Sequence, residues 1–163
     1  AEAKIYETAS ALEQYFGSGP LVLGPTVLSV SDASKSAKAA LSALAVAATV
    51  DSPTRPTHAD KLLPERALAG DPLAKQAMLD KYYTPLADSQ SDLLSTLRAY
   101  LDCGRSLEAT SKQLFVHANT VRYRLKRIQE IIIDNPTDPR SAFMLQIALA
   151  LGAINDSESG VRR

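Results

Sequence analysis

The sequence predicts a mainly α-helical protein, in which a partial α/β segment and a helical connector precede a C-terminal domain of four helices. Three observations predict this fold class. Apolar residues recur at helical spacing over most of the chain, and residues that cap helices precede several of these stretches. Residues typical of strands gather in only one short region, near the N-terminus.

Residues 1–60 are predicted to form the partial α/β segment. It begins with an amphipathic helix over residues 1–16, which stops at the sequence GSGP and has the apolar positions Ile5, Ala9, Leu12 and Phe16. Residues 21–32 are rich in aliphatic side chains and are broken by Gly24-Pro25, which predicts one or two short strands around a bend. Because one strand region cannot form a stable sheet, the unit is either truncated or completed by strands of a partner.

A second helix is predicted to begin at the capping residues Ser31 and Asp32 and to continue to Val50. Residues 51–61 contain two prolines and few apolar side chains, so they are predicted to be a loop or linker that separates two packing units. His58, within this segment, is expected to be a surface residue.

Residues 61–88 are predicted to form the helical connector. Asp71 is the expected N-cap of a helix and Pro72 its first residue. This helix should end near Thr84-Pro85, and its inner stripe should comprise Leu73, Ala77 and Met78. Tyr82 and Tyr83 are expected to pack within the connector.

Residues 89–154 are predicted to form the four-helix domain. Ser89 and Asp92 have capping-box spacing, and the helix that follows should end at Cys103-Gly104. Its inward stripe is predicted to be Leu93, Leu94, Leu97, Tyr100 and Leu101. Ser106 can cap a short second helix, whose candidate packing residues are Leu107, Ala109, Leu114 and Phe115.

The third helix, over about residues 118–133, follows the four-residue joint VHAN, with His117 as its expected N-cap. Asp138-Pro139 opens the fourth helix, and residues 155–163 have the polarity of a disordered tail. Two short helices joined by three or four residues, the second of them cationic, form a helix-turn-helix pattern.

The third helix is two-sided. Its packing face is predicted to comprise Val121, Leu125, Ile128 and Ile132, whereas the opposite and flanking faces carry Asn119, Arg122, Tyr123, Lys126 and Arg127. Arg124 lies nearer the packing face and is expected to pair with Glu108 or Asp102. The net charge of the chain is zero, yet four of its 18 cations lie between residues 122 and 127.

These residue types suit contacts to DNA. Asn119, Thr120, Arg122 and Tyr123 offer an amide, a hydroxyl, a guanidinium and an aromatic ring to base edges in a major groove. His117 and the free amides at the helix start can meet a phosphate, and Lys126 and Arg127 are better placed for phosphates than for bases. The alternative is that this is an ordinary solvated helix face.

The sequence also resembles a known family. The block SLEATSKQLFVHANTVRYRLKRIQEI, with its flanks LLSTLRAYLDCG and DPRSAFMLQIALALGA, closely resembles the C-terminal DNA-binding domain of PucR/CdaR-type bacterial transcription regulators. Its joint and third helix are similar to the Fis-type helix-turn-helix. The resemblance implies that the positions facing DNA are His117, Ala118, Thr120, Arg122 and Tyr123. The sequence departs from the family at Ile132 and Ile133, where a glycine is usual, so the helix is expected to end later or with a different cap.

The resemblance extends upstream of this domain. The segment LLPERALAGDPLAKQAMLDKYYTPL is similar to the connector of actinobacterial members, and the region before it to the tail of their degenerate GGDEF-like middle domain. No GGDEF loop is present, so cyclase activity is not expected. The resemblance implies control of a metabolic operon, and the actinobacterial character favours lipid synthesis; the effector and the operator sequence are left open.

No enzymatic activity, cofactor or metal site is expected. The chain lacks paired catalytic carboxylates, His58 and His117 lie too far apart to suggest a metal cluster, and the single cysteine, Cys103, allows no internal disulfide. The single cysteine fits a reducing, cytoplasmic setting. The most apolar run, Ala39 to Val50, is too short to span a membrane and is expected to be a buried helix.

The expected partners are double-stranded DNA and a second copy of the chain. The fourth helix is apolar almost all round, so either the upstream helices or a second subunit must cover one face, and we expect a homodimer. The alternative is a protein–protein interaction module that uses this helix.

Overall fold

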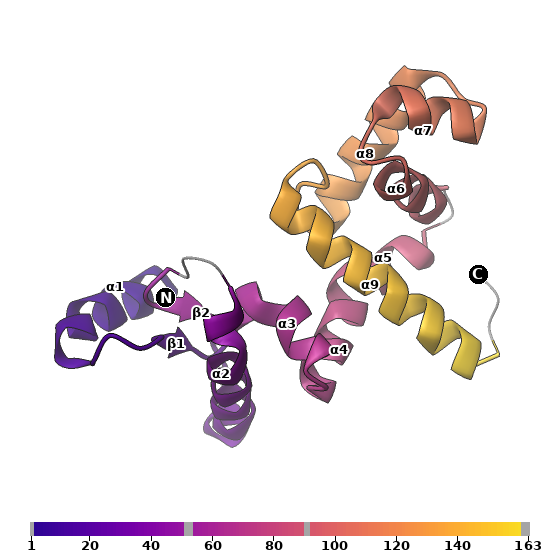
Figure 1. Ribbon diagram of the computed structural model, residues 1–163. Coiled ribbons are helices and arrows are strands. Elements are labelled where there is room, and N and C mark those ends of the chain that lie inside the picture. The colour runs from indigo at the N-terminus through magenta and orange to yellow at the C-terminus, as the bar shows by residue number, and fades with distance from the viewer. Residues whose placement is uncertain (1, 51–53, 90–91, 161–163) are drawn as a thin grey trace. The chain divides into compact units, whose positions relative to one another are not determined.

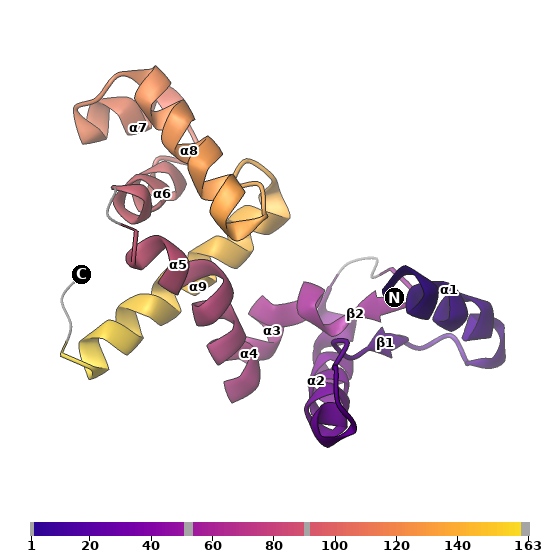
Figure 2. The ribbon, with the colours of Figure 1, turned by 180° about the vertical axis from the view of Figure 1, so that it is seen from behind.

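The computed structural model describes residues 2–50, 54–89 and 92–160 (Figures 1 and 2). The chain divides into two compact units, Ala1–Lys75 and Gln76–Arg163. The division falls inside the segment that was expected to be the connector, residues 61–88. Among the described helices, none is both long enough and apolar enough to cross a membrane.

The first unit is built on a βαβ arrangement. The chain begins with helix α1 (Glu2–Leu12) and a 3₁₀ turn (Glu13–Tyr15). Strand β1 (Val22–Leu23) follows, then helix α2 (Ala33–Val46) with a 3₁₀ extension (Ala47–Thr49), and finally strand β2 (Thr57–His58). The two strands are parallel, with Val22 opposite Thr57 and Leu23 opposite His58. Helix α2 therefore serves as the crossover that a parallel pair requires.

The core of this unit is a stripe of small side chains on α2. Ala39, Ala43, Val46 and Ala47 recur at helical spacing and pack with Ala59 and Leu62. Ala59 and Leu62 belong to the 3₁₀ turn Ala59–Leu62, which leads directly into α3 (Leu63–Leu68). Several apolar residues of α1 and its extension, including Ile5, Leu12 and Tyr15, are exposed.

The prediction that residues 51–61 form a linker between packing units is wrong for the described part of that segment. Thr57 and His58 form β2, and the amide of Thr57 donates to the carbonyl of Leu21 at 2.8 Å. His58 is half-buried and stacks on Tyr6 with ring centroids 5.9 Å apart, so it is not a simple surface residue. The pairing joins residues more than thirty positions apart, which local composition does not reveal.

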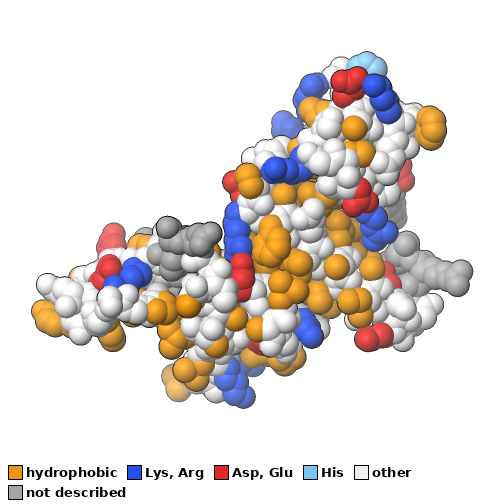
Figure 3. Space-filling model, in the orientation of Figure 1, with side chains coloured by type: hydrophobic (Ala, Val, Ile, Leu, Met, Phe, Trp, Pro, Cys, Tyr) orange, Lys and Arg blue, Asp and Glu red, His pale blue; other side chains and the backbone are white. Residues whose placement is uncertain are grey.

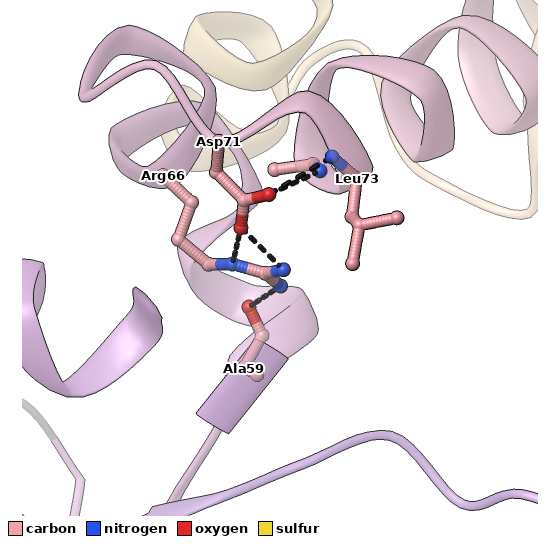
Figure 4. Close-up of polar contacts among 5 residues, drawn as sticks. Ala59, Arg66, Asp71 and Leu73 are labelled. Atoms are coloured by element: carbon pink, nitrogen blue, oxygen red, sulfur yellow. Dashed lines mark hydrogen bonds and ion pairs between the residues drawn. The ribbon is translucent and has the colours of Figure 1, made fainter. Parts of the chain in front are cut away.

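A nearly buried ion pair organises the end of the first unit (Figure 4). The guanidinium of Arg66, on α3, donates to Oδ2 of Asp71 at 2.8 and 3.0 Å and to the carbonyl of Ala59 at 3.2 Å. The other oxygen of Asp71 accepts from the amides of Leu73 and Ala74 and so caps α4 (Pro72–Met78). This confirms that Asp71 is the N-cap and Pro72 the first helical residue.

The helix does not end near Thr84-Pro85 as predicted. It passes through a π-helical segment, Leu79–Tyr83, into α5 (Thr84–Ala87). Pro85 is the second residue of α5 and directly follows the π-helical segment and Thr84. Leu73 is also exposed, contrary to the predicted stripe, and Ala74 is buried.

The second unit contains α6 (Leu93–Asp102), α7 (Leu107–Leu114), α8 (Ala118–Ile132) and α9 (Pro139–Glu158). Helices α6, α7 and α8 pack on one another, and α9 packs on α6 and on the π-helical segment (Figures 1 and 2). Tyr82 and Tyr83 are buried, and their hydroxyls donate to Asp134 at 3.1 Å and to Asp156 at 2.6 Å. The expected packing role of this tyrosine pair is confirmed, and upstream residues cover part of α9.

Some element ends in this unit differ from the predictions. Helix α6 begins at Leu93 with Asp92 as its N-cap, so it starts later than a capping box at Ser89 and Asp92 implies. Asn155–Glu158 continue α9 where a disordered tail was predicted, because Asp156 is held by Tyr83; residues 161–163 lie outside the described residues. Asp138 caps α9 as predicted, accepting from the amide of Ser141 at 2.9 Å.

Candidate nucleic-acid interface

Helices α7 and α8 are joined by a tight turn with defined caps. The Ser106 hydroxyl accepts from the amide of Ala109 at 3.2 Å, and Nδ1 of His117 accepts from the amide of Asn119 at 3.2 Å, so both predicted N-caps are confirmed. Between them, Phe115 takes a left-handed conformation with φ of 54°. The amides of Phe115 and Val116 donate to carbonyls of the last turn of α7, which forms a Schellman motif.

Phe115 and Ala109 were expected to pack inside the domain, and this prediction is wrong. Phe115 is 95% exposed and Ala109 is also exposed. The left-handed backbone at Phe115 directs the chain into the turn and leaves its ring in solvent. The buried residue of α7 is Thr110, whose hydroxyl donates to the carbonyl of Ser106 at 2.6 Å.

The predicted packing face of α8 is confirmed. Its buried residues are Val121, Leu125, Ile128 and Ile132. They face α6 and α7, which contact α8. The opposite side of α8 is therefore free of contacts with these two helices.

All eight residues predicted to face DNA lie on α8 or at its N-cap. The exposed ones are His117, Asn119, Arg122, Tyr123, Lys126 and Arg127, and the half-buried ones are Ala118 and Thr120. The structure thus brings them together on one helix. Ala118 and Thr120, in the first turn, present less surface than the other six.

The four cations of α8 have different electrostatic surroundings. Arg124 donates to the carboxylate of Asp92 at 2.8 Å and to the hydroxyl of Thr96 at 3.1 Å. Arg127 pairs with Glu130 at 2.6 Å. Within the part of the chain that the structure describes, Arg122 and Lys126 have no acidic partner.

The prediction that Arg124 pairs with Glu108 or Asp102 is wrong, although Arg124 does form an ion pair within the domain. Glu108 pairs instead with Lys112 on α7, at 2.8 Å, and a hydrogen bond from Lys112 lowers the pKa of Glu108. Sequence reasoning missed Asp92 and Thr96 as the groups that hold Arg124. Asp92 is 32 positions away, so only packing of α6 against α8 reveals the contact.

The charged surface around α7 and α8 is mixed, with basic and acidic side chains interspersed (Figure 3). Local features define the class of this domain. Two helices are joined by a tight turn, and the second helix has one buried face and one polar face. On the polar face, Arg122 and Lys126 have no acidic partner among the described residues. This is the architecture of a helix-turn-helix DNA-binding domain.

Comparison with known proteins identifies the type of this helix-turn-helix domain. Residues 93–151 match the PucR C-terminal helix-turn-helix domain. A crystal structure of a regulator of polyketide synthase expression from Bifidobacterium adolescentis superposes with a TM-score of 0.84 and 40% identity, covering 92% of this chain and 60% of that one. Residues 93–151 are therefore a helix-turn-helix domain of the PucR C-terminal type, and the relatives of the chain include transcription regulators.

The curated relatives are longer proteins. An uncharacterized protein of Mycobacterium tuberculosis is 46% identical over 140 residues, which cover 86% of this chain and 34% of the relative. The purine catabolism regulatory protein of Bacillus subtilis is 36% identical over 80 residues, covering 45% of this chain and 15% of that protein. The chain thus spans about a third of the length of the mycobacterial relative.

Proposed function

We propose that the second unit binds double-stranded DNA in a sequence-specific manner, with α8 in the major groove. The observation that carries this proposal is the division of α8 into one buried apolar face and one polar face, because six of the eight predicted residues are exposed on α8 or at its N-cap. A recognition helix needs this division, because one face must anchor it to the domain while the other reaches base edges.

The proposed roles follow from position and charge. Arg122 lies near the start of α8, where recognition helices contact bases, and its guanidinium suits a guanine edge. Lys126 lies one turn further on and is proposed to bind a phosphate, as is Arg127 once it leaves Glu130. His117, Ala118, Thr120 and Tyr123 are proposed to contact the DNA around the first turn.

The experiment compares Arg122→Ala with Lys126→Ala by mobility shift on cognate and scrambled DNA at two salt concentrations. Arg122→Ala should weaken cognate binding by about 1 to 3 kcal/mol and relax preference at one base pair. Lys126→Ala should weaken binding to all sequences alike and reduce the salt slope by about one unit. Equal losses on both DNAs for both variants would contradict these roles.

The chain is proposed to form a homodimer through α9, and each subunit is proposed to bind one DNA half-site. Hydrophobic side chains gather over this helix in Figure 3, and the exposed ones include Phe143, Ala150 and Ile154. The competing function is a protein interaction module that uses the same face. Sedimentation and DNA titration of Ile154→Glu beside the wild type distinguish these two functions. If the chain is a DNA-binding dimer, the variant should become monomeric and bind cognate DNA more weakly. If the chain is an interaction module, the wild type itself should not bind DNA.

The remaining assignments are part of the same proposal. Residues 1–60 are proposed as the end of a GGDEF-like middle domain, 61–88 as the connector and 89–154 as the DNA-binding domain of a cytoplasmic regulator. The target is proposed to be a metabolic operon, with lipid synthesis as the first one to examine. Selection of bound DNA from a random pool would identify the operator.

A further inference from the structure

The side chains of Asn119 and Arg122 contact each other on the exposed face of α8. Nη1 of Arg122 donates to Oδ1 of Asn119 at 2.5 Å, across the i,i+3 spacing that brings side chains together on a helix. We infer that Asn119 is a positioning residue that holds the guanidinium of Arg122 for base recognition, and does not itself read a base. This inference rests on the proposed DNA-binding function and deepens it.

The chemistry of the two groups determines which amide atom faces the guanidinium. A guanidinium has donors only, so the atom of Asn119 that meets it must be the carbonyl oxygen. An asparagine that reads adenine needs both ends of its amide, because Oδ1 accepts from the base while Nδ2 donates to it. In Asn119 the acceptor is turned toward Arg122, in a charge-assisted hydrogen bond stronger than one to a neutral base.

Arg122 keeps its capacity to read a guanine after this contact. A guanidinium has five N–H donors, and a guanine edge requires only two of them. An arginine that is already held in one geometry also loses less side-chain freedom when it binds than a freely moving one.

A second pair on the same helix shows why an amide suits this position. Arg127 is held by Glu130 with the same i,i+3 spacing, at 2.6 Å. Glu130 neutralises the charge of its arginine, whereas the neutral Asn119 leaves the charge of Arg122 available to DNA. The two pairs share the i,i+3 spacing but differ in the charge of the acceptor. Glu130→Gln is the matched control, because it replaces the charged acceptor by an amide at the second pair.

The experiment measures base preference and affinity of the whole chain by selection of bound DNA and titration of the selected site. Asn119→Ala should relax preference at the same base pair as Arg122→Ala and weaken cognate binding about 2- to 10-fold, the loss expected for one hydrogen bond. The double variant should bind no more weakly than Arg122→Ala alone, because Asn119 acts only through the arginine.

Asn119→Asp gives an independent readout. It keeps the acceptor and removes the amide donor, so a positioning role predicts the same base preference with weaker binding to every sequence, from the added negative charge. The control Glu130→Gln should strengthen binding to every sequence and leave the preference unchanged. Circular dichroism of each variant verifies that α8 is intact.

Three results would overturn the inference while leaving DNA binding in place: a changed preference at a different base pair in Asn119→Ala, multiplicative losses in the double variant, or lost preference in Asn119→Asp. A wild-type chain that prefers no sequence in the selection would instead reject the proposed function itself. This last outcome is visible before any variant is made, so the two failures are distinguishable.

Discussion

Helices of the second unit end in left-handed residues of two kinds. After α6 the position is held by Gly104, with φ of 61°, whereas after α7 and α8 it is held by Phe115 and by Ile133, with φ of 56°. A left-handed conformation costs an L-residue about 1 to 2 kcal/mol, and a β-branched side chain is rarely found there. Ile133 is 88% exposed, so burial does not compensate for its backbone conformation.

Replacing Ile133 by glycine should therefore stabilise the second unit. We expect Ile133→Gly to raise its free energy of unfolding by about 1 kcal/mol, measured by urea unfolding followed by circular dichroism. The neighbouring substitution Ile132→Gly is the control. Because Ile132 is helical and only 2% exposed, its replacement should lower the free energy of unfolding by about 2 kcal/mol or more. Destabilisation by both would show that the conformation at Ile133 carries no strain.

At the level of single elements, the π-helical segment Leu79–Tyr83 fits closely against α9. A Cβ built on Gly152 would overlap the ring of Tyr83, so the absence of a side chain there lets the ring approach the helix. Glycine is otherwise unfavourable in a helix by about 1 kcal/mol relative to alanine. Close packing is thus the physical reason for a glycine in the middle of α9.

Gly152→Ala should destabilise the second unit, against its helix propensity. Overpacking against the Tyr83 ring costs about 1 to 3 kcal/mol, which exceeds the gain from propensity. In a Tyr83→Ala background the clash is absent, so the same substitution should become stabilising. Thermal unfolding of the four proteins in this cycle checks the change of sign, and the same sign in both backgrounds would contradict the packing argument.

The Arg66–Asp71 pair links three elements of the first unit and predicts a pH dependence. Burial alone would raise the pKa of Asp71, but hydrogen bonds from Ser42, Arg66 and the Ala74 amide, together with the charge of Arg66, lower it overall. A lowered pKa in the folded state means that Asp71 contributes stability above its unfolded pKa of about 3.9, and this contribution is lost as the pH falls through the folded value.

Asp71→Asn should remove this contribution. Asparagine still caps α4, but Arg66, only 3% exposed, loses its counter-charge, so the first unit should lose about 3 to 5 kcal/mol at pH 7 and less below pH 4. Asp138→Asn is the matched control, because Asp138 caps α9 before a proline and has no ion pair among the described residues. Equal losses in urea titrations of both variants would contradict the argument.

The elements that sequence reasoning predicted well are those set by local chemistry. Each of the caps at Asp71, Ser106 and Asp138, and the buried stripe of α8, depends on residues of a single helix and its cap. Strand β2 and the acidic partner of Arg124 depend on residues more than thirty positions away. Local pattern cannot register such contacts, because they exist only after the elements have packed.

At the level of the whole molecule, the two compact units divide between Lys75 and Gln76, within the segment predicted to be the connector. Residues before Ser89 are among the most buried of the second unit, including Met78, Tyr82 and Leu86. Burial of each such side chain contributes about 1.5 to 3 kcal/mol, a large part of the stability of a small domain. The net charge of the whole chain is zero, so it does not indicate the candidate nucleic-acid interface on α8.

Two fragments test this division. A fragment of residues 76–163 should unfold cooperatively and bind the selected DNA with the preference of the whole chain. A fragment of residues 89–163 should be several kcal/mol less stable, because α9 loses the tyrosines of the π-helical segment that pack against it. Equal stability of the two fragments in urea would show that residues 76–88 do not stabilise the second unit.

The π-helical segment also constrains the length of the chain. Tyr82 and Tyr83 are adjacent, yet their hydroxyls reach carboxylates at the two ends of α9, Asp134 just before it and Asp156 near its last turn. A π-turn accommodates one more residue than an α-helical turn, so deleting a single residue from Leu79–Tyr83 would restore a regular helix and rotate α4 about the helix axis relative to α5. An insertion or deletion in this segment would therefore change the orientation of the last residues of α4 relative to α5 without altering a residue on the exposed face of α8.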